Sequence, residues 1–298
     1  MPFDLQSIVA GVLAANAKWA AGATAITDLS DSQRAARLGY TPGAGDISLA
    51  ERIEAALANL PSNTGPPPSG SPVQMDWRNV DGASYISAIK DQGNCGSCVA
   101  FGTCAAIGAG MRIAKAQPVG GSDTAVSDVS EAQLFYCGAE QQDGKTCETG
   151  WSPTSALPYC QSTGLVSESV FPYTACDQPC NLPANWQESL TKISGSTSLN
   201  SLSVMKTAIA QSGPLITVFM VFDDFYSYTS GVYTRTSDTA EGGHCICVIG
   251  YDDSQEAWLC KNSWGTGWGE EGFFWIGYGQ CGIDAQMYRI DGFTSIVS

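Results

Sequence analysis

The sequence contains one histidine and few positive charges, and both shortages restrict what the protein can do. Among 298 residues there is a single His, and 14 Lys and Arg stand against 29 Asp and Glu, which gives a net charge of −15. A nucleic acid or an anionic membrane surface would require clustered cations, so we expect neither as a partner. Any reaction that needs an imidazole must use His244. No pair of short Cys or His motifs repeats as a structural zinc site requires, and we expect no metal and no cofactor.

Long hydrophobic runs are also missing. We find no uninterrupted apolar stretch of the roughly 18 residues that a membrane span needs. A hydrophobic content of 44% with 14% charged residues is typical of a folded chain and excludes a mostly disordered one. A length of 298 residues suits one large domain or two smaller ones.

Cysteine, by contrast, is abundant. Twelve cysteines favour an oxidising compartment with several disulfides. Residues 8–15 are apolar and precede a small-residue site, but Asp4 occupies the region where a signal peptide carries positive charge. We therefore expect a secreted, periplasmic or lysosome-like protein, with no clear signal peptide in this chain.

The composition divides the chain into three parts. Residues 1–60 are rich in small residues and have a helical texture, and residues 61–72 form a linker of Pro, Gly and Ser. Ser48 and Glu51 have the spacing of a capping box, which predicts a helix to about Asn59. One face of that helix should carry its apolar residues, Ile53, Ala56, Leu57 and Leu60.

The body of the chain changes from helical to strand-like patterns. We predict a buried helix over 98–115 and shorter helices over 130–137 and 153–162. Strand-like runs follow at 215–221, 244–251, 257–261 and 272–277. This order predicts an α+β fold with a helical part at about 72–182 and a β part at about 183–298.

Cys98 begins the predicted buried helix. A thiol there lies at the positive end of the helix dipole, which favours the reactive thiolate. The dipole supplies only roughly 0.3–1 kcal/mol, so a second cation is needed. His244 is the only imidazole that can provide it.

Several motifs resemble the papain family of cysteine peptidases over residues 72–298. Cys98 and His244 are 146 residues apart, within the spacing typical of that family. The motifs that carry the resemblance are Gln92-Gly93-Asn94-Cys95-Gly96-Ser97-Cys98, Gly242-Gly243-His244, Lys261-Asn262-Ser263-Trp264-Gly265 and Cys281-Gly282-Ile283. The resemblance is strongest to the cathepsin B branch. It implies a papain-like fold of two subdomains, with a central catalytic helix on the helical side, a β-barrel-like second part and the active site in the cleft between them.

The resemblance also implies the role of each site residue. Cys98 would be the nucleophile and His244 the general base and acid. Asn262 would hold the imidazole tautomer, and Gln92 with the Cys98 backbone N–H would form the oxyanion hole. Trp264 would shield the hydrogen bond between His244 and Asn262 from water.

Substrate contacts are implied in the same way. Gly150 would pair with the substrate backbone, and Gly243 is placed with it among the binding residues. A pocket for the second residue before the scissile bond would be lined by Trp151, Ser152, Val218, Gly242 and Gln286. Gln286 as a neutral polar floor suggests medium apolar or polar side chains, unless it points to solvent.

For the cysteines, the resemblance implies a disulfide Cys95–Cys147 and a second one from Cys137. We assign its partner as Cys176, with Cys180 as the alternative. Cys104 is expected to be a buried free thiol, and no counterpart is found for the family's partner of Cys281.

Residues 1–71 are expected to be an inhibitory prosegment that is removed within the linker. The segment around Trp19 and the stretch ending in Leu38, Gly39 and Tyr40 resemble the short prosegments of the cathepsin B branch. Gly39 would let the backbone pass close to Cys98, and Trp19 would anchor the segment. A loosely attached helical appendage is the alternative.

The function expected from these residues is a monomeric papain-like cysteine endopeptidase, made as a zymogen, that acts on polypeptides. An endopeptidase is favoured because the chain has no spare histidine for the occluding loop of cathepsin B. Three alternatives remain: a restricted aminopeptidase, acyl transfer on the same pair of residues, and a non-catalytic binding protein of papain fold.

Overall fold

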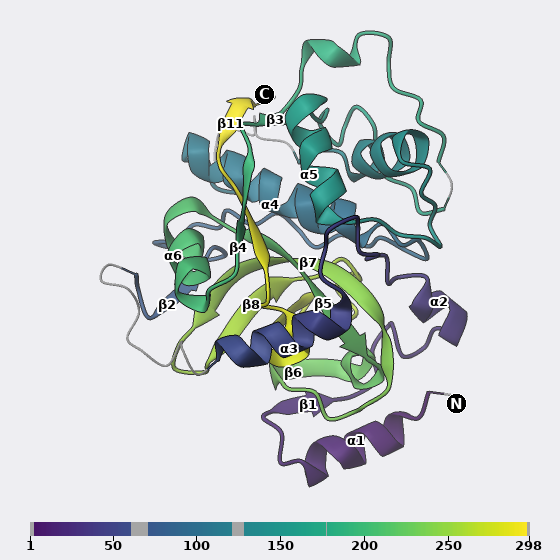
Figure 1. Ribbon diagram of the computed structural model, residues 1–298, viewed down its shortest axis with the longest axis vertical. Helices are drawn as coiled ribbons and strands as arrows, with labels where there is room; N and C mark the ends of the chain where they lie inside the picture. Colours follow the sequence, from purple (N-terminus) through teal and green to yellow (C-terminus); the bar gives the residue numbers. More distant parts are fainter. Residues whose placement is uncertain (1–2, 61–70, 121–127, 177, 297–298) are drawn as a thin grey trace.

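The computed structural model of the protein describes residues 3–60, 71–120, 128–176 and 178–296. The expected linker at 61–72 therefore lies almost entirely outside the described residues. Figure 1 shows a helical part above a part built on a twisted β-sheet, with the N-terminal segment wrapped around the sheet. This two-part α+β architecture confirms the predicted fold class.

The helices are α1 (Leu5–Ala14), α2 (Asp31–Ala35), α3 (Leu49–Asn59), α4 (Cys98–Lys115), α5 (Pro153–Ser162), α6 (Leu202–Ser212) and the π-helix η2 (Gln133–Gln142). Short 3₁₀ turns are η3 (Trp186–Glu188), η4 (Asp223–Ser227) and η5 (Gln280–Gly282). The strands are β1 (Trp19–Ala21), β2 (Gln74–Asp76), β3 (Lys192–Ile193), β4 (Ser196–Leu199), β5 (Leu215–Phe222), β6 (Tyr228–Tyr233), β7 (Ala240–Asp252), β8 (Ala257–Lys261), β9 (Phe273–Gly277), β10 (Met287–Ile290) and β11 (Phe293–Ser295).

The main sheet runs in the order β1-β6-β9-β8-β7-β5-β10-β4, and β2 pairs with β7. Its long central strands β5, β7 and β8 are antiparallel and almost fully buried, which explains their nearly continuous hydrophobic sequences. Strand β2 pairs with β7 in this sheet, although it precedes the predicted division of the chain near residue 182. Helix α6 packs against the sheet and lies within the region predicted to be β-structure.

Helix α4 has the predicted bounds and packs against β7. A Cβ on Gly102 would lie 3.1 Å from Cys245 Sγ, so glycine permits this close contact. By length and hydropathy α4 could cross a membrane, but 72% of it is buried inside the protein, as suits a core helix.

The helical part departs from prediction at residues 130–137. A π-helix occupies Gln133–Gln142 instead of a short α-helix, and it extends five residues further. Apolar spacing over so few residues does not distinguish π from α winding.

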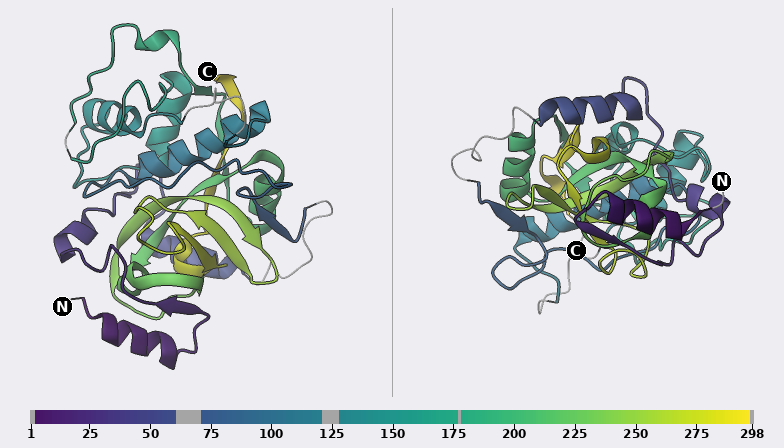
Figure 2. Two further views of the ribbon diagram at one scale, coloured as in Figure 1. Left: turned by 180° about the vertical axis from the view of Figure 1, so that it is seen from behind. Right: turned by 90° about the horizontal axis from the view of Figure 1, so that it is seen from below.

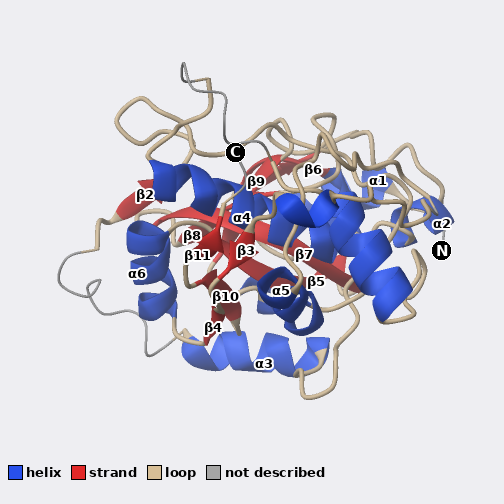
Figure 3. Cartoon of the chain, turned by 90° about the horizontal axis from the view of Figure 1, so that it is seen from above, coloured by secondary structure: helices blue, strands red, loops and turns tan. Residues whose placement is uncertain are grey.

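The N-terminal segment is less helical than its composition suggested. Strand β1 joins the sheet through β6, with Trp19 opposite Gly231, and the Trp19 indole N–H donates to the Thr234 carbonyl at 2.9 Å. Figures 1 and 2 place α1 and β1 at the end of the molecule away from the helical part, and Figure 3 shows α3 along one side.

Helix α3 begins with the predicted capping box between Ser48 and Glu51. Its buried face, however, is centred on Arg52 and Ala56, while Leu57 is 51% exposed. The expected apolar face was therefore right for Ala56 and wrong for Leu57, and it did not include Arg52.

Candidate active site

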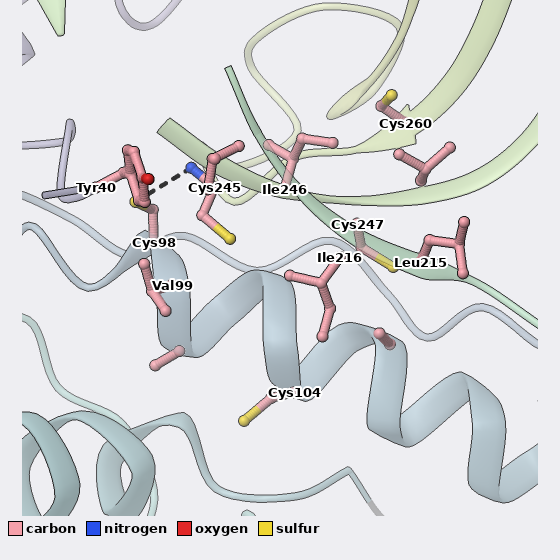
Figure 4. Close-up of a cluster of buried hydrophobic side chains, with 14 of the residues drawn as sticks. Tyr40, Cys98, Val99, Cys104, Leu215, Ile216, Cys245, Ile246, Cys247 and Cys260 are labelled. Carbon is pink, nitrogen blue, oxygen red and sulfur yellow. Dashed lines mark hydrogen bonds between the residues drawn. The ribbon is translucent and has the colours of Figure 1, made fainter. Parts of the chain in front are cut away.

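Cys98 is the first residue of α4 and is fully buried. The Cys245 backbone N–H donates to its Sγ at 3.4 Å, as the dashed line in Figure 4 marks. The backbone N–H of Gly39, in the N-terminal segment, bonds to the same sulfur. The helix N-terminus and this amide both favour negative charge on the sulfur.

His244 and Asn262 come from neighbouring strands. His244 lies in β7, Asn262 directly follows β8, and Nε2 of the ring is 2.7 Å from Asn262 Oδ1. The Ser263 backbone N–H also donates to Oδ1 at 2.8 Å, which fixes the amide. Asn262 therefore holds Nε2, and the other ring nitrogen, Nδ1, is buried. The Trp264 ring lies 4.7 Å from the imidazole, between centroids, in the expected shielding position.

Gln92 is oriented by Ser263, which lies just after the end of β8. Its Oε1 accepts from the Ser263 hydroxyl at 2.7 Å. Its Nε2 donates to the Cys95 carbonyl at 2.7 Å and to the Arg37 carbonyl at 3.1 Å. The side-chain amide assigned to the oxyanion hole therefore already donates to two peptide carbonyls. One of them, the Arg37 carbonyl, belongs to the N-terminal segment.

Residues 37–41 cross the site and are bonded to both sides of it. The Trp151 N–H donates to the Gly39 carbonyl at 2.8 Å, and the Thr41 N–H donates to the Trp151 carbonyl at 2.9 Å. On the other side, the Tyr40 N–H donates to the Gly243 carbonyl at 3.0 Å. Beneath this crossing, Cys98 and His244 are both fully buried.

Two glycines allow this close approach. A Cβ on Gly39 would lie 1.9 Å from the Gly96 carbonyl oxygen, and a Cβ on Gly150 would lie 2.3 Å from the Gly39 carbonyl oxygen. Real Cβ atoms do not occupy such positions, so only glycine fits at either place. Gly150 also has a positive φ of 61°.

Burial in the covered site disfavours both the Cys98 thiolate and the His244 imidazolium. It raises the pKa of the Cys98 thiol to about 11, although four backbone N–H groups act in the opposite direction. It lowers the pKa of His244 to about 4, although the hydrogen bond that the ring N–H donates to Asn262 acts in the opposite direction. The covered site therefore favours neutral thiol and neutral imidazole.

The residues expected to bind substrate lie around the same segment. Trp151, Ser152 and Val218 are buried, and Gly243 contacts Tyr40 directly. Gly242 faces Leu38, since a Cβ there would be 3.2 Å from the Leu38 side chain. Gln286 is half-buried and donates to Ser198 Oγ, so it does not simply point to solvent.

The disulfides require one correction. Cys95–Cys147 forms as expected, but Cys137 pairs with Cys180 at an S–S distance of 2.01 Å. Cys176 is an exposed free thiol with a positive φ of 78°. Both candidates follow Pro172 within a short loop, and sequence spacing alone does not choose between them. Cys104 and Cys281 are buried and free.

Sequence reasoning missed three contributors to the site. The Arg37 carbonyl accepts a hydrogen bond from Gln92 Nε2, and the Arg37 side chain forms an ion pair with Asp91 at 2.6 Å. Ser263 orients Gln92, and Arg52 is buried beside Val218 and Gln286. Ser263 directly follows the motif Asn and could have been found there; no sequence signal marks a buried arginine on α3.

Comparisons with known proteins agree with this geometry. The family described as papain family cysteine protease matches residues 71–290. Cathepsin B-like CP3 of Giardia intestinalis is 34% identical over 240 residues, covering 75% of each chain. Pro-cathepsin H of Mus musculus is 31% identical over 245 residues, covering 79% of this chain and 68% of that protein. Among solved structures, procathepsin B S9 of Trypanosoma congolense aligns over 99% of this chain and 100% of its own, with a TM-score of 0.76 and 20% identity. Procathepsin L2 of Tenebrio molitor has a TM-score of 0.74 and 27% identity, over 96% of this chain and 88% of its own.

Proposed function

This chain belongs to the papain family of cysteine proteases, and we propose that it is an endopeptidase in which Cys98, His244, Asn262 and Gln92 carry out peptide hydrolysis. The observation that supports these roles most directly is the 2.7 Å contact between His244 Nε2 and Asn262 Oδ1. It leaves one ring nitrogen to serve the thiol at the start of α4.

The chemistry follows from the positions of these groups. The Cys98 sulfur attacks the scissile carbonyl carbon while His244 holds the thiol proton. The developing oxyanion takes the place of the Arg37 carbonyl on Gln92 Nε2, joined by the Cys98 backbone N–H. His244 then gives its proton to the leaving amine, and the same imidazole activates water to hydrolyse the thioester.

We further propose that residues 1–71 are an inhibitory prosegment cut from the peptidase within 61–72. The hydrogen bonds of residues 37–41 on both sides of Cys98 support this, as does the burial of Trp19 at 6% exposure. A tethered segment acts at high effective concentration, so modest contacts suffice to hold it in place. The two disulfides suit an oxidising compartment.

The endopeptidase assignment is tested by the pattern of cleavage. An unstructured protein and a peptide blocked at its N-terminus are incubated with the chain after the linker has been cut. Internal cleavage of both supports the proposal. Stepwise release from free N-termini only, with the blocked peptide intact, would instead establish an aminopeptidase.

A further inference from the structure

Arg37 and Asp91 form an ion pair where residues 37–41 cross the site. Arg37 Nη1 donates to Asp91 Oδ1 at 2.6 Å, and the Arg37 side chain is 8% exposed while that of Asp91 is 50% exposed. Of the ion pairs among the described residues, this is the only one that includes either of them. The cation belongs to the N-terminal segment and the carboxylate to the part that matches the papain family, so loss of the segment separates them.

The peptidase part holds the Asp91 carboxylate in place without help from Arg37. The Gly93 N–H donates to Asp91 Oδ1 at 2.9 Å. The residues before and after Asp91 form backbone hydrogen bonds with residues 263–265, at 3.1 and 2.9 Å. Because all of these contacts lie within the peptidase part, the carboxylate should keep its position after the segment leaves.

The crossing segment marks the two directions along the cleft. Gly39 and Thr41 bond to Trp151, which the family resemblance places on the side of the residues before the scissile bond. The Gly39 N–H bonds to the Cys98 sulfur. Arg37 precedes Gly39 in this path, so it lies beyond the sulfur, on the side of the residues after the scissile bond.

The surroundings of Asp91 agree with this direction. Asp91 forms a β-bridge with Trp264, whose ring lies 4.7 Å from the His244 imidazole, between centroids. In the proposed mechanism this imidazole gives its proton to the leaving amine, so the first residues after the scissile bond lie on the same side of the site. A side chain of the leaving peptide would there meet a carboxylate that has lost its cation.

We propose that Asp91 makes the processed enzyme prefer a basic residue at the first or second position after the scissile bond. This inference rests on the proposed function and names a feature of its substrates. A guanidinium or ammonium group at that position takes the place of Arg37 and forms a charge-assisted hydrogen bond with the carboxylate. Since Asp91 is half exposed, water and salt weaken the ion pair, and the preference should be moderate and should decline as salt rises.

The test uses the whole chain, folded and then cut at a protease site placed in the 61–72 linker, with the released segment removed. Blocked peptides share one cleavage site and differ only at the first or the second residue after it, which is arginine, citrulline or glutamate. Citrulline keeps the shape of arginine without its charge. At low salt we expect kcat/KM to be at least about threefold higher for arginine than for citrulline at one of the two positions, and lowest for glutamate. Equal cleavage of the arginine and citrulline peptides at both positions would overturn the inference.

The variant Asp91→Asn locates the effect, because its side-chain oxygen can still accept from the Gly93 N–H. In this variant the ratio of arginine to citrulline cleavage should fall to about one. Glu188→Gln removes the same charge from an exposed carboxylate of η3 and should leave the ratio as it is in the parent enzyme. A preference for arginine that persists in Asp91→Asn would assign it to another group and remove Asp91 from the account.

Binding of the released segment tests the same ion pair without any cleavage. In a Cys98→Ala background, Arg37→Gln should weaken the segment at least about threefold on a peptidase that retains Asp91, and much less when Asp91→Asn is added. Equal weakening on both would show that Asp91 does not recognise the cation, and it would contradict the inference.

These results also separate the inference from the function on which it rests. Cleavage of all the peptides without preference for a basic residue removes the inference and leaves the peptidase. Failure to cleave any of them, or an unstructured protein, overturns the proposed function and the inference together.

Discussion

At the scale of single residues, the motifs picked out side chains that the fold brings together. Gln92, Cys98, His244 and Asn262, widely separated in sequence, lie together in the structure, and the contact with Trp264 is where it was expected. The roles of these residues remain a proposal that chemistry must test. The sequence did not predict Cys180 as the partner of Cys137, or the burial of Arg52, because both depend on how loops and helices pack rather than on local pattern.

One residue-scale prediction concerns the thiol of Cys98. A thiol below its pKa is protonated, and in the covered site that pKa is about 11. In the uncut chain, iodoacetamide should therefore react with Cys98 negligibly at pH 7. After cutting and removal of the segment, Cys98 should react readily at pH 7, because the helix dipole and the His244 imidazolium stabilise its thiolate. Mass spectrometry of the alkylated cysteines measures both states.

His244→Gln provides the control for that experiment. No other imidazole exists in the chain, so the pH profile of alkylation in the cut variant should move to higher pH. An unchanged profile would mean that the imidazole does not activate the thiol.

A second prediction separates stabilisation of the oxyanion by Gln92 from the reactivity of the Cys98 thiolate. Gln92→Ala in the cut enzyme should retain labelling of Cys98 but lower kcat by roughly 10²–10³, about 2.7–4 kcal/mol, the range for loss of one oxyanion donor. KM should change little, because the donor acts on charge that develops in the transition state. Unaltered kcat would remove Gln92 from the oxyanion hole.

At the scale of elements, periodicity worked best for long, regular segments. Helix α4 and strand β8 have their predicted bounds, and the capping box of α3 is present. Strand β1 was missed because three residues carry no period of their own and are extended only through pairing with β6. The wrong face of α3 has a similar cause: Arg52 is buried by a partner surface that hydrophobicity does not reveal.

The segment that crosses the site gives an element-scale prediction. In Gly39→Ala the new methyl would collide with the Gly96 carbonyl oxygen, at 1.9 Å in the present geometry. Residues 37–41 must then shift, so the affinity of the cut segment for the peptidase should fall at least about tenfold, or 1.4 kcal/mol. Titration calorimetry in a Cys98→Ala background measures this without self-cleavage.

Gly11→Ala is the matched control for this substitution. Gly11 lies in α1 of the same segment, and a Cβ there meets nothing within 4 Å. Its affinity should equal that of the parent chain. A loss of equal size in both variants would show that the close approach at Gly39 does not hold the segment in place.

At the scale of the whole molecule, class and architecture were predicted from the order of helical and strand-like patterns together with the family motifs. The order of strands in the sheet was not, because pairings such as β10 with both β4 and β5 join residues far apart in the chain. For residues 3–60, the sequence predicted an anchor at Trp19 and a crossing of the site at 38–40, but not the rest of their path around the sheet.

Because the N-terminal segment covers His244, the affinity of the cut segment for the peptidase should depend on pH. The Cys98→Ala variant is used so that titration of the Cys98 thiol does not contribute. The covered imidazole has a pKa of about 4, below the ordinary 6.5, so its contribution to binding is complete above pH 6.5 and is lost as the pH falls toward 4. The affinity of the cut segment should fall by up to about 3 kcal/mol over that window. Measured between pH 6.5 and 5, where ordinary carboxylates stay ionised, the fall should be absent when His244→Gln is added. The same fall in both variants would assign it to other groups.

The most direct test of the account is the rate at which an unstructured protein is cleaved before and after a single cut in the 61–72 linker, with Cys98→Ala as the inactive reference. The account predicts negligible cleavage by the intact chain, rapid internal cleavage after the cut and dissociation of the segment, and none at any stage for Cys98→Ala. Equal cleavage before and after the cut would contradict the inhibitory role of residues 1–71, and cleavage by Cys98→Ala would contradict the assignment of the nucleophile.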